Sequence, residues 1–429
     1  MFSDPNRDLK LLPIAAVYGA NGSGKSNFYY AIEFIRNLVL RPAQAPEEQI
    51  LVTPFRLDDT SEEQPSRFSV EILTDGGAIF RLSFSVTAKA VTEEKLELID
   101  GGKDRLVYSR ATEDGKPVWD LKYFERDGTR SEDRDFMSFK ARDTLANQLF
   151  ISVLRGRQIA EVESVIAWFR DGLQLMTPNT VFKQLEMNLK AVDGLRAYCI
   201  EALRNADTGI CDLDREEISL DAVPLPAEIK DMKQFLRKMI PEGSAILLGA
   251  PDGQRFTLRH ENDELRATRL LTVHRTKSGK NVKFYMADES DGTQRFVDLL
   301  PVFYDLAKSE RPKVFVIDEI DRSLHPELTR NLLEAFLESL VPSSRSQLIF
   351  TTHDVMLLDQ DLLRRDEIWF FDKEEDGHSR LSALSDFKGV RADKDIRKSY
   401  LLGRFGGTPR IMGFPRRAPS TEDLEPAQS

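Results

Sequence analysis

The stretch Gly19-Ala20-Asn21-Gly22-Ser23-Gly24-Lys25-Ser26 constrains the fold more than any other feature of the sequence. It follows a short apolar run, 14–18, typical of a strand buried on both faces, and it precedes apolar residues that recur at helical spacing up to Pro42. G-x-x-x-x-G-K-S between a strand and a helix is the pattern of a phosphate-binding P-loop, whose backbone N–H groups surround phosphate oxygens at a helix N-terminus. We therefore expect Lys25 to reach the β- and γ-phosphates of a nucleotide and Ser26 to bind Mg²⁺. The alternative is a chance glycine-rich turn.

A second apolar run, 314–317, ends in two adjacent carboxylates, Asp318 and Glu319. Burial penalises unpaired charge, so packing alone does not explain this pair. Beside a P-loop, the first carboxylate is expected to hold the Mg²⁺ shell and the second to act as general base on the attacking water. A strand that simply ends in a solvated acidic pair is the competing interpretation.

Two further segments are candidates for the same site. The apolar run 348–350 leads to His353, and ligands gather at the carboxyl ends of parallel strands, so His353 could contact the γ-phosphate or the attacking water. Glu289-Ser290-Asp291-Gly292-Thr293-Gln294 precedes a helical pattern. This start is either an ordinary N-cap or an anion-binding site, and the residues alone do not decide between them.

The order of the patterns predicts an α/β protein built around a P-loop core. Residues 1–150 are expected to hold the P-loop half and, from 68 to 127, an antiparallel β subdomain with alternating apolar residues. A helical insertion is expected over 151–243, and the half that carries Asp318 and His353 over 244–413, where strands and helices alternate again. The tail, 414–429, is rich in Pro, Ser and Glu and is expected to be disordered.

Composition narrows the function classes. The 429 residues contain 60 Lys and Arg against 71 Asp and Glu, a net charge of −11, which argues against nucleic-acid binding by bulk charge. Two cysteines exclude a disulfide scaffold, and there is no apolar run long enough to cross a membrane. We expect a cytoplasmic protein without membrane attachment. Arg275, Lys277, Lys280 and Lys283 surround a predicted hairpin, which is either a solvated turn or a local DNA contact.

Taken in this order, the motifs resemble those of an ABC-type ATPase. Residues 19–26 resemble Walker A, 290–294 the signature motif, Asp318-Glu319 Walker B with its catalytic glutamate, 323–326 the D-loop and His353 the switch histidine. The sequences around two of the motifs, YGANGSGKSN and DEIDRSLHPELTR, are similar to those of the soluble branch of these ATPases, which includes SMC, RecF and the overcoming-lysogenization-defect ATPases. Within it, the chain resembles the AAA-type ATPases of bacterial abortive-infection and other anti-phage systems, also in ESDGTQR, QLIFTTHDVMLLD and YLLGRFGGTP.

The resemblance implies specific roles for residues of this chain. ATP would be held by the P-loop and, from a neighbouring subunit, by the signature segment; Mg²⁺ by a hydroxyl and a carboxylate; and hydrolysis would depend on a glutamate and a histidine. The P-loop residues are Gly19, Asn21, Gly22, Ser23, Gly24, Lys25, Ser26 and Asn27. The residues of the signature segment are Ser290, Gly292 and Thr293. The Mg²⁺ ligands are Ser26 and Asp318, and the residues on which hydrolysis depends are Glu319 and His353.

The family resemblance also implies partners: a head-to-tail homodimer or higher oligomer, a separate effector such as a nuclease, and a DNA or phage-protein trigger. The alternative function is an SMC- or RecF-like ATPase that clamps DNA in repair or chromosome maintenance, and a transporter ATPase subunit is a third. Two departures stand out. Only about a dozen residues precede the P-loop strand, where relatives usually have an extra strand segment, and the Q-loop glutamine is either Gln148 or Gln158.

Overall fold

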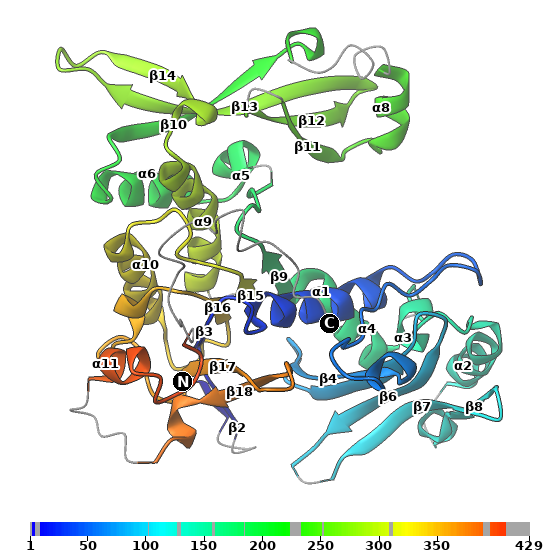
Figure 1. Cartoon of the computed structure of the whole chain (residues 1–429). Coiled ribbons are helices and arrows are strands. Elements are labelled where there is room, and N and C mark those ends of the chain that lie inside the picture. Colours follow the sequence, from blue (N-terminus) through cyan, green and yellow to red (C-terminus); the bar gives the residue numbers. More distant parts are fainter. Residues whose placement is uncertain are drawn as a thin grey trace, which may run out of the picture.

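The computed structural model describes residues 2–4, 9–101, 103–126, 130–156, 159–183, 185–223, 233–250, 253–308, 312–388 and 395–408. Its centre is a six-stranded sheet (Figure 1). In spatial order the strands are β18 (Ser379–Ala383), β17 (Ile368–Lys373), β3 (Ile14–Gly19), β16 (Gln347–Thr351), β15 (Val314–Ile317) and β9 (Leu173–Met176). All neighbours run parallel except β18, which is antiparallel to β17.

Both faces of this sheet are buried, as its apolar strands predict. Successive residues of β15 point to opposite sides, so that Phe315 and Ile317 join one hydrophobic core and Val316 joins another. The first core includes residues of α9 (Asp291–Ala307), α10 (Pro326–Ser339) and α11 (Ile396–Leu401). The second core includes residues of α1 (Lys25–Leu40) and α4 (Ala160–Ala167). Helices therefore cover the sheet from two sides, which fixes the loops at its carboxyl edge.

An antiparallel sheet forms a lobe beside α1 (Figure 1). Its strands follow one another in sequence order: β4 (Ser66–Leu73), β5 (Ile79–Val86), β6 (Val91–Ile99), β7 (Arg105–Glu113) and β8 (Lys116–Asp120). The short helices of this region are η1 (Ser61–Glu63), η2 (Lys122–Glu125), α2 (Ser131–Asp143) and α3 (Phe150–Val153). One face of the sheet is buried, as the alternation in the sequence predicts, and its residues Phe80 and Leu82 share a hydrophobic core with residues of α1.

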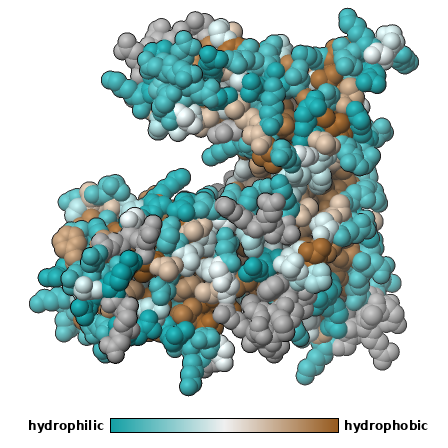
Figure 2. Space-filling model, turned by 180° about the vertical axis from the view of Figure 1, so that it is seen from behind, coloured by the Kyte–Doolittle hydropathy of each residue, from teal (hydrophilic) through white to brown (hydrophobic). Residues whose placement is uncertain are grey.

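A second antiparallel lobe, which we call the insertion lobe, lies above α9 in Figure 1. Its strands are β10 (Ile210–Ile218), β11 (Ala245–Gly249), β12 (Arg255–Glu261), β13 (Glu264–Arg275) and β14 (Asn281–Tyr285). The helices around it are α5 (Leu185–Ala191), α6 (Leu195–Asn205), η4 (Leu220–Ala222), α8 (Lys233–Met239) and η5 (Met286–Asp288). Seen from behind, the surface is deeply hollowed between this lobe and the rest of the molecule (Figure 2).

The remaining described elements are β1 (Phe2–Asp4), β2 (Leu9–Leu11), η3 (Trp168–Gly172), η6 (Val355–Leu357) and η7 (Leu384–Asp386). β1 and β2 pair with each other, so a strand hairpin does precede the P-loop strand within the first dozen residues. Among the helices that the structure describes, none has the length and apolar character needed to cross a membrane.

The predicted α/β class with an antiparallel β subdomain is confirmed, but the stretch 151–243 needs correction. It holds the expected helices and also two strands that the sequence did not predict, β9 and β10. β9 completes the central sheet beside β15, and β10 pairs with β13 across the expected boundary at 243/244. Within this stretch, α5 and α6 are separate helices, because Gly194 adopts a left-handed φ of 81° between them. The tail, 414–429, lies outside the described residues.

Candidate functional site

The glycine-rich loop joins β3 to α1 at the carboxyl edge of the central sheet, as the sequence predicts. Gly22 and Gly24 have φ values of 76° and 107°, in the region that favours glycine. A Cβ on Gly24 would also lie 2.6 Å from Ser379 Oγ of β18, whereas a Cβ on Gly22 would meet no atom within 4 Å. The loop is thus packed against β18 at Gly24, and there is open space around Gly22.

Lys25 lies at the start of α1 with its side chain folded over the loop. Its Nζ donates hydrogen bonds to the carbonyl oxygens of Gly19 at 2.6 Å and Ala20 at 3.1 Å. Burial lowers the pKa of the Lys25 ammonium, and the carboxylates of Asp318, Glu319 and Asp321 oppose that shift. The cation therefore lies within electrostatic range of the acidic side chains that follow β15.

The other P-loop side chains differ in exposure. Asn21 and Asn27 are exposed and Ser26 is half-buried. Ser23 is 2 % exposed, and its hydroxyl has no hydrogen-bond partner among the described residues. A buried hydroxyl without a partner is costly, so this loop offers a polar group that a ligand or water would satisfy.

Asp318 and Glu319 follow β15 directly and differ in their surroundings. Asp318 is buried, and its Oδ1 accepts a 2.6 Å hydrogen bond from Thr351 Oγ1 at the end of β16. The same threonine oxygen accepts the Glu319 N–H at 2.8 Å. Glu319 has a φ of 47°, a backbone conformation rare outside glycine, and Thr351 helps to hold it there.

His353 lies two residues beyond β16, close enough to this group for the charges to interact. Burial lowers the pKa of its imidazole, the Lys25 cation lowers it further, and Asp321, Glu319 and Asp318 oppose the shift. Burial and the Lys25 cation thus favour the neutral form of the imidazole. The structure thus brings Lys25, Asp318, Glu319 and His353 together at one edge of the sheet, as the sequence predicts.

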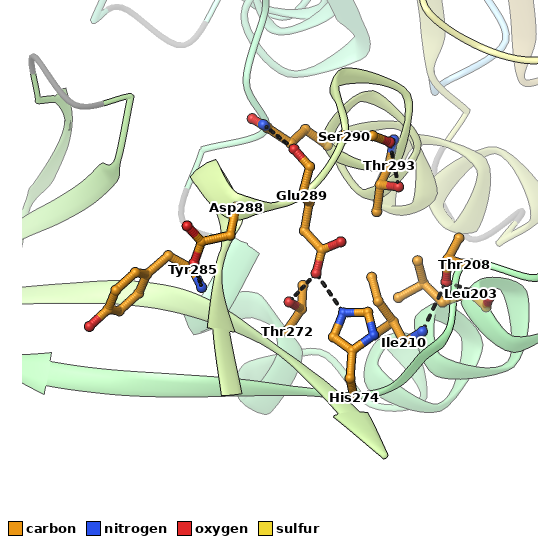
Figure 3. Close-up of polar contacts among 11 residues, drawn as sticks. Leu203, Thr208, Ile210, Thr272, His274, Tyr285, Asp288, Glu289, Ser290 and Thr293 are labelled. Atoms are coloured by element: carbon orange, nitrogen blue, oxygen red, sulfur yellow. Dashed lines mark hydrogen bonds and ion pairs between the residues drawn. The ribbon is translucent and has the colours of Figure 1, made fainter. Parts of the chain in front are cut away.

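The segment that resembles the signature motif begins α9. Ser290 is its N-cap: the Ser290 hydroxyl accepts the Thr293 N–H at 3.1 Å and lies 2.9 Å from Thr293 Oγ1 (Figure 3). The N-cap interpretation is therefore confirmed, and anion binding by the same residues stays a prediction. A Cβ on Gly292 would lie 2.6 Å from the carbonyl oxygen of Ser323, so this position needs glycine for a close backbone approach. No hydrogen bond joins Ser290 or Thr293 to the P-loop within the described part of the chain.

Of the two candidates for the Q-loop glutamine, the structure describes Gln148, and it lies away from this site. The Gln148 side chain donates to Ala43 O at 2.6 Å and accepts the Leu145 N–H at 3.0 Å. Ala43 follows the far end of α1, and a helix of 16 residues is roughly 24 Å long. Gln148 therefore stabilises the loop after α1 in this conformation. Gln158 lies outside the described residues.

Sequence reasoning missed two contributors to the site. One is Thr351, for which a threonine at the end of an apolar strand is a usable signal. The other is the loop after α11, where Gly406 and Gly407 have φ values of 69° and 68°. A Cβ on Gly407 would lie 3.0 Å from Phe371 O and 3.4 Å from the Cα of Gly19, the first residue of the P-loop. The Gly407 N–H bonds Asp372 Oδ1 at 3.1 Å, and Tyr400 Oη donates to Gly407 O at 3.0 Å.

The family model described as "AAA domain, putative AbiEii toxin, Type IV TA system" matches residues 14–172 and 197–359. The chain belongs to this AAA family. The matched ranges include the P-loop, the signature-like segment, Asp318, Glu319 and His353. Family membership supports nucleotide binding at this site and an ATPase as the class of protein. No curated protein matches the chain.

Solved structures similar to this AAA protein include two SMC heads. A crystal structure of the SmcHead bound to the C-winged helix domain of ScpA is 17% identical, with a TM-score of 0.31, and the match covers 86% of this chain and 90% of that one. The SMC head domain from Thermotoga maritima is 12% identical, with a TM-score of 0.33, and the match covers 86% and 89%.

Proposed function

We propose that the chain is an ATP-binding and ATP-hydrolysing enzyme of an anti-phage, abortive-infection-like defence system. In this proposal it acts as a sensor or scaffold and controls a separate effector, such as a nuclease, through ATP-dependent head-to-tail assembly. The observation that carries the ATPase part is the convergence of Lys25, Asp318, Glu319 and His353 at one sheet edge. The defence role rests on the sequence resemblance and on the family, whose description names the AbiEii toxin.

The residues at this edge fit a nucleotide with Mg²⁺. The buried Ser23 hydroxyl lacks a partner among the described residues, and there is open space around Gly22. The Lys25 ammonium donates only to two loop carbonyls, and it could exchange these bonds for bonds to phosphate oxygens. No group of three or more His, Cys, Asp or Glu among the described residues is arranged to hold a metal. Mg²⁺ does not need one, since it is usually bound by one or two carboxylates together with substrate phosphates and water. Ser26 and Asp318 would hold it, and it would neutralise charge that develops on the phosphates.

The chain's own side chains then divide the work. Lys25 places a cation beside the phosphates, and the N–H groups of the loop from Gly19 to Asn27 contribute hydrogen bonds at the start of α1. Thr351, at the end of β16, accepts the backbone N–H of Glu319 and so holds this residue in place. The Glu319 carboxylate can then accept a proton from the attacking water. A neutral His353 can accept or donate a hydrogen bond to that water or to the γ-phosphate.

Single-site variants test the ATPase part. Lys25→Ala is expected to abolish ATP binding, because it removes the charge that faces the phosphates. Glu319→Gln is expected to keep ATP binding and stop turnover, because the amide cannot accept the proton of water. Equal ATP affinity in the wild type and in Lys25→Ala would contradict the assignment of the P-loop.

A mixing experiment tests the head-to-tail arrangement. Gly292→Asp places a side chain against Ser323 O and is expected to inactivate the signature segment, while Glu319→Gln inactivates the site of its own subunit. In a mixed dimer one site carries both defects and the other carries neither. We expect activity to return on mixing. Mixed dimers that form and remain inactive at every ratio would contradict a composite site.

The alternative, an ATPase that clamps DNA directly, is favoured by one surface feature. The tip of the β13–β14 hairpin exposes Arg275, Lys277 and Lys280, which form no ion pair with other described residues, whereas Lys283 pairs with Asp214 at 2.7 Å. This alternative predicts salt-sensitive DNA binding by the isolated protein, weakened by Lys277→Gln and Lys280→Gln. A control exchange elsewhere, such as Lys89→Gln, should leave that binding unchanged.

A further inference from the structure

The carboxylate that precedes the signature-like segment lies between η5 and the N-cap of α9, and the insertion lobe binds it. Glu289 Oε1 accepts hydrogen bonds from Thr272 Oγ1 and, at 2.7 Å, from His274 Nε2 (Figure 3). Both donors are on β13, and Thr272 is fully buried. The Glu289 side chain is only 10% exposed, so water screens this contact little.

The register of the lobe explains why both donors face Glu289. Thr272 and His274 are two residues apart on β13 and therefore share one face of the sheet. Phe284 of β14 is opposite Thr272 in the register, so it lies on the same face, and its ring centroid is 4.9 Å from that of His274. The imidazole is thus packed on one side and hydrogen-bonded on the other, which fixes its orientation.

A second strand of the lobe holds the same end of α9. Gln294 Nε2 donates to the backbone oxygen of Glu289 at 3.0 Å, and Gln294 Oε1 accepts a 3.0 Å bond from Arg255 at the start of β12. Arg255 also pairs with the buried Asp298 at 2.7 Å. The first turns of α9 are therefore attached to β12 and β13 by side chains on both partners.

From these contacts we infer that Glu289 is a positioning residue, through which the insertion lobe sets the place of Ser290 and so controls hydrolysis in the neighbouring subunit. The inference rests on the proposed function, in which Ser290, Gly292 and Thr293 complete the ATP site of the partner. Ser290 is joined to Glu289 by a single peptide unit and is exposed. A small displacement of β13 would therefore move the Ser290 hydroxyl, and catalysis is sensitive to shifts of about 1 Å.

The test removes the two donors without removing side-chain volume. Thr272→Val deletes the hydroxyl, and His274→Phe deletes Nε2 while keeping a ring beside Phe284. Each is expected to lower kcat about tenfold and to leave the ATP dissociation constant within about twofold, because the P-loop of the same subunit is untouched. Glu289→Gln retains an acceptor oxygen and is expected to keep more activity than Glu289→Leu. Arg266→Gln, which changes an exposed side chain at the other end of β13, is the control and should match the wild type.

Mixed dimers separate a positioning role from a general loss of structure. A fixed amount of the His274→Phe protein is titrated with an excess of Lys25→Ala protein. The mixed dimer then contains one site with an intact P-loop and an intact signature segment, so activity should rise. Wild-type protein titrated with an excess of the Lys25→Ala, His274→Phe double variant should instead lose ATPase activity by about tenfold. In that mixed dimer the one intact P-loop, from the wild-type subunit, faces the altered signature segment.

The outcomes are distinct. Equal activity in the two titrations, a loss of ATP affinity in His274→Phe, or unchanged kcat in both donor variants would each overturn the inference while the ATPase assignment stands. A wild-type protein that hydrolyses no ATP, or whose activity survives Lys25→Ala, would overturn the proposed function and the inference with it.

Discussion

Thr351 joins two functional groups through one oxygen atom. Its hydroxyl donates to the buried Asp318 carboxylate and accepts the N–H of Glu319, whose backbone is in the left-handed region. Thr351→Val keeps the shape and removes both bonds, and we expect it to lose about 1–3 kcal/mol of stability, because a buried carboxylate is left without its donor. Urea unfolding measures the loss, and turnover should fall with it. Thr351→Ser restores the hydroxyl and should recover most of both, and a valine variant as stable as the wild type would contradict this role.

Gly407 offers a second test at the residue scale, because a matched glycine lies nearby. Gly407→Ala would put a methyl group between Phe371 O and the P-loop, and we expect weaker ATP binding as well as a stability loss of about 1–2 kcal/mol from its positive φ. Gly403 has a similar φ of 72°, but its Cβ would meet only the Thr408 hydroxyl, at 3.1 Å. Gly403→Ala should therefore lose similar stability and keep its ATP affinity. Equal ATP affinity in both variants, measured by calorimetry, would show that the loop does not support the P-loop.

At the scale of elements, the attachment of α6 to the core can be followed through its cysteine. Cys199 is fully buried on α6, and burial raises the pKa of its thiol to about 12. At pH 8 only about one thiol in 10⁴ is then ionised, and the thiolate is the reactive form. We expect a Cys211→Ser variant to resist a thiol reagent in its native state and to react at once in urea. Rapid native labelling would mean that α6 leaves the core readily.

At the scale of the whole molecule, assembly should depend on the nucleotide. Glu319→Gln with ATP and Mg²⁺ is expected to shift from 48.9 kDa towards twice that mass, because the composite site joins two subunits only while ATP remains intact. Light scattering after size exclusion measures this shift. Adding Lys25→Ala to the same variant should abolish it, and a monomer in the presence of saturating ATP would contradict the head-to-tail arrangement.

The sequence predicts the centre of the site better than its surroundings. The P-loop, Asp318-Glu319 and His353 are each marked by an apolar strand that ends in polar residues, which is a local signal. β9 has only four residues and follows a helix, so its place beside β15 depends on a pairing across more than 130 residues. The role of Thr351 and the contact of Gly407 with Gly19 likewise depend on strands and loops that are distant in sequence, and spacing alone does not reveal them.

The order of strands in the central sheet has a consequence for synthesis of the protein on the ribosome. The sheet neighbours of β3 are β16 and β17, and β16 begins 328 residues after β3 ends. At about 5–20 residues per second, the synthesis of β16 begins roughly 15 to 65 s after that of β3 ends. The five strands from Ser66 to Asp120 can pair with one another long before that. A nascent chain should therefore carry a folded antiparallel lobe together with an unfinished ATP site, and during that interval the exposed edges of β3 are open to chaperones.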